Sequence, residues 1–501
     1  MKLCNPLEMN DWRISSFVLF SFVMLALLWT AFFINSNGFL SPLLQQVVGC
    51  VCLLYIPGIA VLRVFRLHKL GSVETPLYAV GISISLIMFT GMLLNLSLPF
   101  VGFNDPLSSS HLILAYSAAL VGLCIACYAR DKDFAAPTHL HLNALSPGFL
   151  CLLLLPFLSI FGTYLVNNYE TNGLIPFLLI CIGAVVIVIT SHKAADGSMY
   201  PLAIFSISLS LLLSNTLISH YLWGWDVFGE ANVANVVANN AIWNPAYAVD
   251  YGSYVGMNIA RYNSVLSISI LAPVLMKICA IDTTSLFKIV YPIIYALVPV
   301  ALYQFFRRHT SDTPAFLASF YFVAMPQFSV EMAALAREEI AQLFLVLALL
   351  MIFNKTFNKR TKESLLILFS SAMIVSHYGI SYLFMFELII VYALLFVMDR
   401  GARGTVKPNK NLALWKSKAL LRTSSKEPRH SGITLLFVIL FLMITLLWNA
   451  YAGGRSTFPL LIRALTNTIT TNFLSSTSAQ TLAKLHLSTT PLALIASRLN
   501  T

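Results

Sequence analysis

The feature that most constrains this chain is a series of apolar runs, each long enough to form a membrane-crossing helix of about 20 residues. In the first 220 residues these runs lie at 15–34, 43–62, 77–98, 111–129, 148–166, 174–190 and 200–219. Only 10% of the 501 residues are charged, whereas a soluble domain carries about 25%. This excludes a water-soluble enzyme and predicts an all-α polytopic membrane protein.

Basic residues lie in alternate gaps between these runs, and this alternation predicts the orientation of the chain. Lysine, arginine or histidine occurs in the gaps 63–75, 130–147 and 191–199, while lysine and arginine are missing from the gaps 35–42, 99–110 and 167–173. Basic loops remain in the cytoplasm. We therefore expect a multi-pass protein of the cell membrane with a cytoplasmic N-terminus and a long extracytoplasmic loop at 220–262.

The apolar stretch 264–281 is expected not to cross the membrane. If it crossed, the gap 400–430, with nine lysines and arginines and one acid, would lie outside the cell. A re-entrant or interfacial segment, broken near Pro273, avoids this. Six further crossings then follow, which brings the expected total to thirteen: 286–306, 313–327, 339–354, 363–376, 381–398 and 431–449.

This arrangement divides the chain into four parts. They are N-terminal spans (1–199), a core with outer loops 220–262 and 328–338 (200–400), a basic cytoplasmic loop (401–430), and a last span with an extracytoplasmic tail (431–501). None of these parts is a soluble basic domain that could fit a nucleic-acid groove. We therefore expect membrane lipids, and no nucleic acid, as partners.

Asp226 and Glu230 are the first candidate site residues, because they follow a span directly and are four residues apart. On a helix both carboxylates would share one face, with Val233 and Val237 on the turns that follow. Two like charges at this spacing destabilise a helix by roughly 0.2–0.5 kcal/mol. The pair therefore indicates a cation between the acids, one protonated acid, or a cationic substrate group. An ordinary solvated acidic turn is the alternative.

Two further polar groups lie at the expected outer face. Arg261 precedes the shallow segment, where its guanidinium could bind a phosphate through two hydrogen bonds or anchor a lipid headgroup. Arg337-Glu338-Glu339 stands at the entrance of a span. These three residues either mark the water boundary or line a cavity as a paired arginine and carboxylate.

A third polar group is the turn that contains His377 and Tyr378. The histidine could bind a metal or a phosphate, or it could be a hydrogen-bonded packing residue. The chain has no glycine-rich phosphate loop, no HExxH and no GxSxG motif in a usable context. A sugar or phosphate donor would therefore have to come from the membrane.

The acidic loop after a span, the shallow segment and the second polar loop together resemble the GT-C class of membrane glycosyltransferases. Asp226 and Glu230 match the acidic motif of that class, and Arg337-Glu338-Glu339 matches its second loop. Residues 221–398 are also similar to an archaeal family of uncharacterised multi-pass proteins, through the segments Tyr262-Asn263-Ser264, Phe287-Lys288-Ile289-Val290-Tyr291-Pro292, Ala336-Arg337-Glu338-Glu339 and Ser376-His377-Tyr378-Gly379. The chain departs from the better-known relatives in placing six spans before the one that bears the acidic loop, and in lacking their large outer domain.

The resemblance implies an inverting glycosyltransferase with a polyprenyl- or dolichyl-phosphate sugar donor and a glycan, lipid or protein acceptor at the outer face. It implies Asp226 as general base, and Glu230 as a residue that orients the acceptor or shares a divalent cation such as Mg²⁺ or Mn²⁺. The residues expected to bind substrate or phosphate are Arg261, Arg337, Glu338, Glu339, His377 and Tyr378. A transporter or flippase of lipid-linked glycans and a non-catalytic scaffold are the alternatives.

Overall fold

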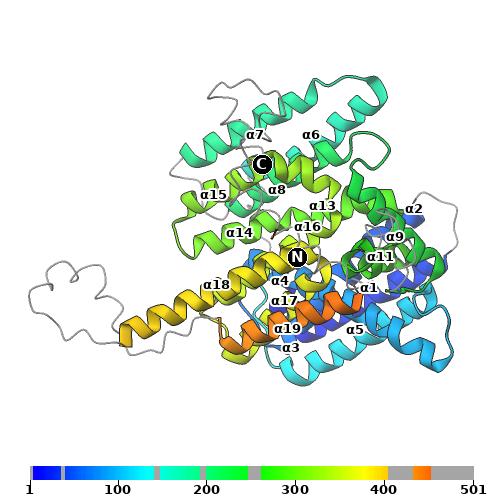
Figure 1. Cartoon of the computed structure of the whole chain (residues 1–501). Helices are drawn as coiled ribbons and strands as arrows, with labels where there is room; N and C mark the ends of the chain where they lie inside the picture. Colours follow the sequence, from blue (N-terminus) through cyan, green and yellow to red (C-terminus); the bar gives the residue numbers. More distant parts are fainter. Residues whose placement is uncertain are drawn as a thin grey trace, which may run out of the picture.

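The computed structural model describes residues 4–34, 40–139, 147–191, 199–245, 261–403, 433–452 and 466, and this part of the chain contains helices and no β-strand (Figure 1). Nine of the described helices are long and apolar enough to cross a membrane. The predicted all-α polytopic class is therefore confirmed. The predicted basic loop lies outside the described residues from 404 onward, as does most of the tail.

The predicted total of thirteen crossings is not confirmed. Each of the thirteen windows does contain a helix, but four of these helices are not among the nine candidate spans. Helix α15 (Asp312–Ala324) has only 13 residues. Helix α17 (Lys359–Ser376) has four charged residues in its first turns. The other two helices, α8 (Tyr200–Thr216) and α16 (Ala336–Ile352), have 17 residues each.

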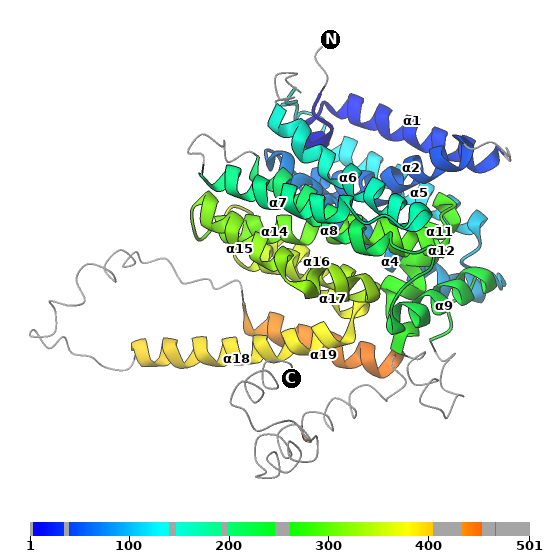
Figure 2. The same ribbon diagram turned by 90° about the horizontal axis from the view of Figure 1, so that it is seen from above.

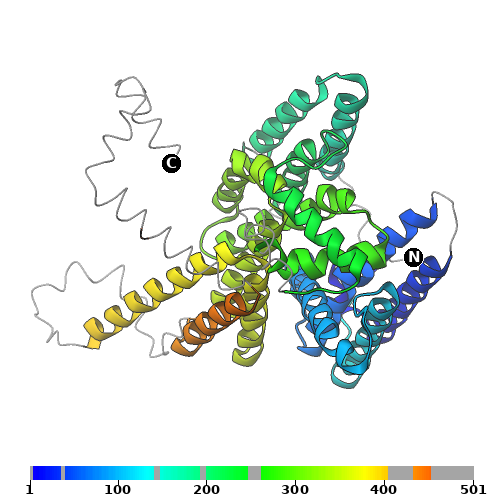
Figure 3. The ribbon, with the colours of Figure 1, turned by 45° about the vertical axis from the view of Figure 1, so that its right-hand side comes forward.

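The remaining helices in the first half of the chain follow the predicted windows closely. They are α1 (Ile14–Phe33), α2 (Leu40–Leu54), α3 (Ile56–Val64), α4 (Gly71–Ser97), α5 (Ser109–Asp131), α6 (Pro147–Tyr169) and α7 (Leu174–Ser191). Helices α1 to α5 pack together on one side of the molecule, and α6 and α7 pack with α8 on another (Figure 3).

Helix α16 lies at the centre of the bundle, because its sequence after the first turn is apolar on every side except at Gln342. It packs against α17, α14 (Leu297–Arg307) and α13 (Tyr291–Tyr295). Two further helices, α18 (Tyr378–Arg403) and α19 (Leu435–Ala452), extend from the bundle beside each other (Figure 1). The N-terminal end of α16, and not its apolar body, carries the charged residues.

The segment 264–281, which is predicted not to cross the membrane, contains a short helix. A π-helical turn (Ser267–Leu271) leads into α11 (Ala272–Cys279), with Pro273 in the first turn of α11. These 13 residues rise about 20 Å, which is less than the hydrocarbon core of about 30 Å. The segment is covered by α2, α4 and α9 (Trp225–Asn240), and most of its side chains are buried.

Helix α9 lies across one end of the bundle, on the right in Figure 2. It begins at Trp225, after Gly224, whose φ of 120° is in a region that side chains rarely adopt. A Cβ atom on Gly224 would also lie 2.3 Å from Cβ of Ala334 in the second polar loop. Glycine at this position therefore lets the start of α9 approach that loop.

Candidate functional site

The two acids of the first loop lie on one face of α9, as their spacing predicts. Asp226 is in the first turn of the helix, where its dipole favours a negative charge. Val233 and Val237 are buried on the turns that follow, while Asn232 and Asn239 are exposed. The helix is thus anchored by its valines, and its two carboxylates lie in its N-terminal half.

Arg337 lies between the two carboxylates and binds both of them. Its Nη2 atom is 2.7 Å from Oδ2 of Asp226, and its Nη1 atom donates a hydrogen bond to Oε1 of Glu230. The backbone N–H of Ala336, at the start of α16, donates to Oε2 of Glu230 at 2.9 Å. The sequence predicted a cation between the two acids as one possibility. In the structure this cation is the guanidinium of Arg337, which is 107 residues after Glu230 in the sequence.

Tyr262 completes this cluster, although its role was not predicted. Its hydroxyl donates to Oδ1 of Asp226 at 3.0 Å, and its ring lies 5.0 Å from the guanidinium carbon of Arg337, a cation–π contact. A Cβ atom on Gly229 would lie 2.2 Å from the Tyr262 ring. Two signals were available in the sequence: the glycine beside Glu230, which permits close approach of a large side chain, and the position of Tyr262 directly after Arg261.

The two carboxylates differ in exposure, and this difference separates their possible roles. The side chain of Asp226 is 36% exposed, that of Glu230 is 0% exposed and that of Arg337 is 5% exposed. Burial raises the pKa of Glu230, while the neighbouring Arg337 acts in the opposite direction. Burial and the nearby Asp226 also raise the pKa of the Tyr262 hydroxyl. Of the pair, Asp226 is thus the acid that an external molecule can reach.

Asp226 borders a cavity of about 780 Å³ between the two polar loops. Its lining is mostly apolar and consists of Trp223, Gly224, Asp226, Phe228, Val330, Glu331, Ala334 and Leu335. A smaller cavity of about 260 Å³ shares Trp223 and Val330 with it and reaches Lys288. The ammonium of Lys288 donates to the carbonyl oxygens of Ser219 at 2.5 Å and Tyr221 at 2.8 Å.

Glu338 and His377 form a second polar pair beside the cluster. Nε2 of His377 is 3.3 Å from Oε1 of Glu338. The backbone N–H of Ile380 donates to Nδ1 of His377 at 3.1 Å, so the proton of a neutral ring is on Nε2 and faces Glu338. Burial, and next the charge of Arg337, lower the pKa of His377 well below its usual value. His377 is therefore held between the backbone N–H of Ile380 and the carboxyl group of Glu338.

The other predicted residues lie near the cluster without entering the cavity. The Tyr378 ring lies 6.0 Å from the guanidinium carbon of Arg337. Glu339 is buried, and its Oε2 atom has no hydrogen-bond partner within the described part of the chain. Arg261 is half-buried and precedes Tyr262 directly. Among the described residues that line the 780 Å³ cavity, Asp226 is the one predicted site residue.

The expected divalent cation does not fit the carboxylate pair as the structure has it. Arg337 binds both Asp226 and Glu230 and so occupies the position between them. The described residues contain no group of three or more histidine, cysteine, aspartate or glutamate side chains that could hold a metal ion. Arg337 thus takes the place that a divalent cation would have between the two acids.

Residues 362–499 match the family described as "Predicted membrane protein (DUF2206)". No curated protein and no solved structure matches the chain. The family match and the nine candidate spans agree that this is a multi-pass membrane protein.

Proposed function

We propose that this multi-pass membrane protein is a glycosyltransferase that takes a sugar from a polyprenyl- or dolichyl-phosphate donor. One observation carries the proposal: a reachable carboxylate, Asp226, is held by Arg337 and Tyr262 at the edge of a largely apolar cavity. A general base must be reachable by the acceptor and must be held in one orientation. The apolar lining suits a lipid-linked donor. The resemblance to GT-C enzymes supports the same reaction.

In this mechanism Asp226 removes the proton from an acceptor hydroxyl or amide. The acceptor atom then forms a bond to the anomeric carbon, and the bond from that carbon to the phosphate oxygen breaks. The electron pair of the broken bond leaves with the polyprenyl phosphate. Because the attack comes from the face opposite the leaving group, the configuration at the anomeric carbon is inverted. A positioned base of this kind contributes about 10²–10⁴-fold to the rate.

Glu230 takes a different role from the one that the sequence suggested. Its carboxylate is fully buried and is bound by Arg337 and by the backbone N–H of Ala336. We assign Glu230 to holding Arg337, and Arg337 to holding Asp226. Tyr262 fixes the second oxygen of Asp226 by a hydrogen bond. Glu230, Arg337 and Tyr262 are therefore positioning residues in this proposal.

The donor phosphate needs a cation other than Arg337, because both terminal nitrogens of Arg337 already bind carboxylates. Arg261 is the other arginine that the sequence predicted to bind phosphate, and it is half-buried and next to Tyr262. We propose that Arg261 binds the phosphate as negative charge develops on it. An Arg261→Lys variant keeps the charge and loses the two-point geometry, so it stabilises the developing charge less, and its kcat should fall more than its donor KM rises.

The decisive experiment follows sugar transfer in isolated membranes supplied with radiolabelled polyprenyl-phosphate sugars. Asp226→Asn removes the base and keeps the size of the side chain, so transfer should fall by at least about 100-fold. Glu331→Gln is the matched control, because Glu331 lines the same cavity and has no role in the proposed mechanism. Normal transfer by Asp226→Asn at an equal protein level would refute the assignment.

A further inference from the structure

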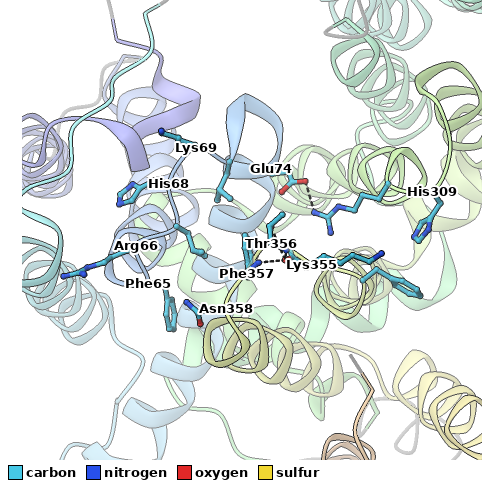
Figure 4. A pocket seen from close by; sticks show the side chains of 15 residues that line it. Phe65, Arg66, His68, Lys69, Glu74, His309, Lys355, Thr356, Phe357 and Asn358 are labelled. Atoms are coloured by element: carbon cyan, nitrogen blue, oxygen red, sulfur yellow. Dashed lines mark hydrogen bonds and ion pairs between the residues drawn. The ribbon is translucent and has the colours of Figure 1, made fainter. Parts of the chain in front are cut away.

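A second large cavity, of about 760 Å³, is shown in Figure 4. It lies at the C-terminal end of α16, whereas Asp226 is bound by Arg337 at the N-terminal end of that helix. Its walls come from Glu74 of α4 and from three connections: 65–70 between α3 and α4, 308–309 after α14, and 353–358 between α16 and α17. The 17 residues of α16 rise about 25 Å, which separates this cavity from the carboxylate cluster. Its volume is in the range of small-molecule sites, about 300–1,000 Å³.

The lining of this cavity is strongly basic. It includes four lysine or arginine side chains, two histidines and a single carboxylate, that of Glu74. The formal charge of the lining is therefore +3 when both histidines are neutral. Glu74 forms an ion pair with Arg308 at 2.8 Å, so it does not balance the other cations.

Two of the four cations already support the fold. Nη1 of Arg308 donates to the carbonyl of Leu350 at 2.9 Å, near the C-terminal end of α16. Nε of Arg66 donates to the carbonyl of Arg130, near the end of α5, at 2.8 Å. Both contacts satisfy carbonyl groups that helices leave unpaired at their C-terminal ends. These two arginines therefore have a structural role that explains their presence.

The two lysines have no such role. Lys69 and Lys355 are exposed, and their ammonium groups have no ion pair or hydrogen bond within the described residues. Asp11 contacts the backbone of Lys69 and not its ammonium group: it accepts a hydrogen bond from the backbone N–H of Lys69 at 3.0 Å and lies 3.3 Å from His68. Lys69 and Lys355 come from opposite walls of the cavity (Figure 4).

Basic residues that serve only to orient the chain in the membrane need only lie somewhere in the cytoplasmic loops. Here three connections that are far apart in the sequence bring their basic residues to one cavity. Basic pockets between membrane helices on the cytoplasmic side bind phosphate headgroups. We propose that this cavity binds a phosphate-bearing anion, either an anionic lipid headgroup or a soluble phosphate compound, through Lys69 and Lys355. This proposal does not depend on the glycosyltransferase activity.

The test uses the full chain purified in a neutral detergent. Binding of inorganic pyrophosphate and of short-chain phosphatidylglycerol is measured separately, with short-chain phosphatidylcholine as the uncharged comparison. The variant Lys69→Ala/Lys355→Ala should bind the preferred probe at least about tenfold more weakly than the wild type. Lys359→Ala/Arg360→Ala is the matched control, because these exposed basic residues lie outside the cavity, and its affinity should equal that of the wild type.

Preference for pyrophosphate would identify a soluble ligand, and preference for phosphatidylglycerol would identify a lipid headgroup; both results support the site. The proposal is overturned if neither anionic probe binds more tightly than phosphatidylcholine, or if both double variants bind alike. Lys355→Glu gives a second test, since reversing one charge of an exposed side chain should weaken binding more than Lys355→Ala does.

Discussion

At the scale of single residues, Arg337 connects the two polar loops. It is buried and binds two carboxylates that come from α9. A buried ion pair adds little stability relative to a well-packed apolar group, but removing one partner leaves the other charge buried and uncompensated. Arg337 is therefore a residue whose loss should affect the whole protein.

We expect Arg337→Ala to lower the free energy of unfolding by about 3–5 kcal/mol, because Glu230 would keep its burial and lose its cation. The matched control is Arg307→Ala, which breaks the exposed Arg307–Asp312 pair (2.6 Å) and should cost about 0–1 kcal/mol. Denaturant unfolding of both purified variants measures the difference. Equal losses would show that Arg337 does not compensate a buried charge.

His377 should make stability depend on pH in the weakly acidic range. Its pKa is lowered in the folded protein by burial and by Arg337, so below its ordinary pKa of 6.5 the unfolded chain binds more protons than the folded chain. Stability is then full above pH 6.5 and is lost as the pH falls below it. Thermal unfolding from pH 7.5 to 5.5 should show this decline, and His377→Gln should reduce it. An unchanged pH profile in the variant would contradict the assignment.

At the scale of elements, the position of Tyr262 depends on how closely its ring packs against α9. Gly229→Ala would place a methyl group 2.2 Å from that ring, and such overpacking costs about 1–3 kcal/mol. The matched control is Gly183→Ala in α7, where a Cβ atom would have no neighbour within 4 Å. We expect a lower unfolding midpoint for Gly229→Ala and an equal or higher one for the control. Sugar transfer by Gly229→Ala should also fall, since Tyr262 would no longer hold Asp226.

At the scale of the whole molecule, the carboxylate cluster and the basic cavity lie at opposite ends of α16. If α16 crosses the membrane, the two sites face opposite compartments. We expect an impermeant thiol reagent to label Glu331→Cys from outside intact cells, in a background without the eight native cysteines. Lys355→Cys should react only after the membrane is opened. Labelling of both positions from one side would contradict this topology.

The local features of the fold followed from the sequence. The apolar windows predicted where the helices lie, and the four-residue spacing predicted that Asp226 and Glu230 share a face of α9. The first prediction uses the length of an apolar run, and the second uses the period of the helix. The number of crossings did not follow, because helices such as α15 and α17 are too short or too charged at one end to be classified by hydropathy.

By itself, then, the sequence determined that this is a helical multi-pass membrane protein with acids at the start of a loop helix. Only the tertiary structure decided that Arg337 binds those acids, that Tyr262 joins them, and that Glu230 is buried while Asp226 is reachable. The physical reason is that the period of a helix determines only which residues three or four positions apart become neighbours. A contact across 107 residues depends instead on how the helices pack.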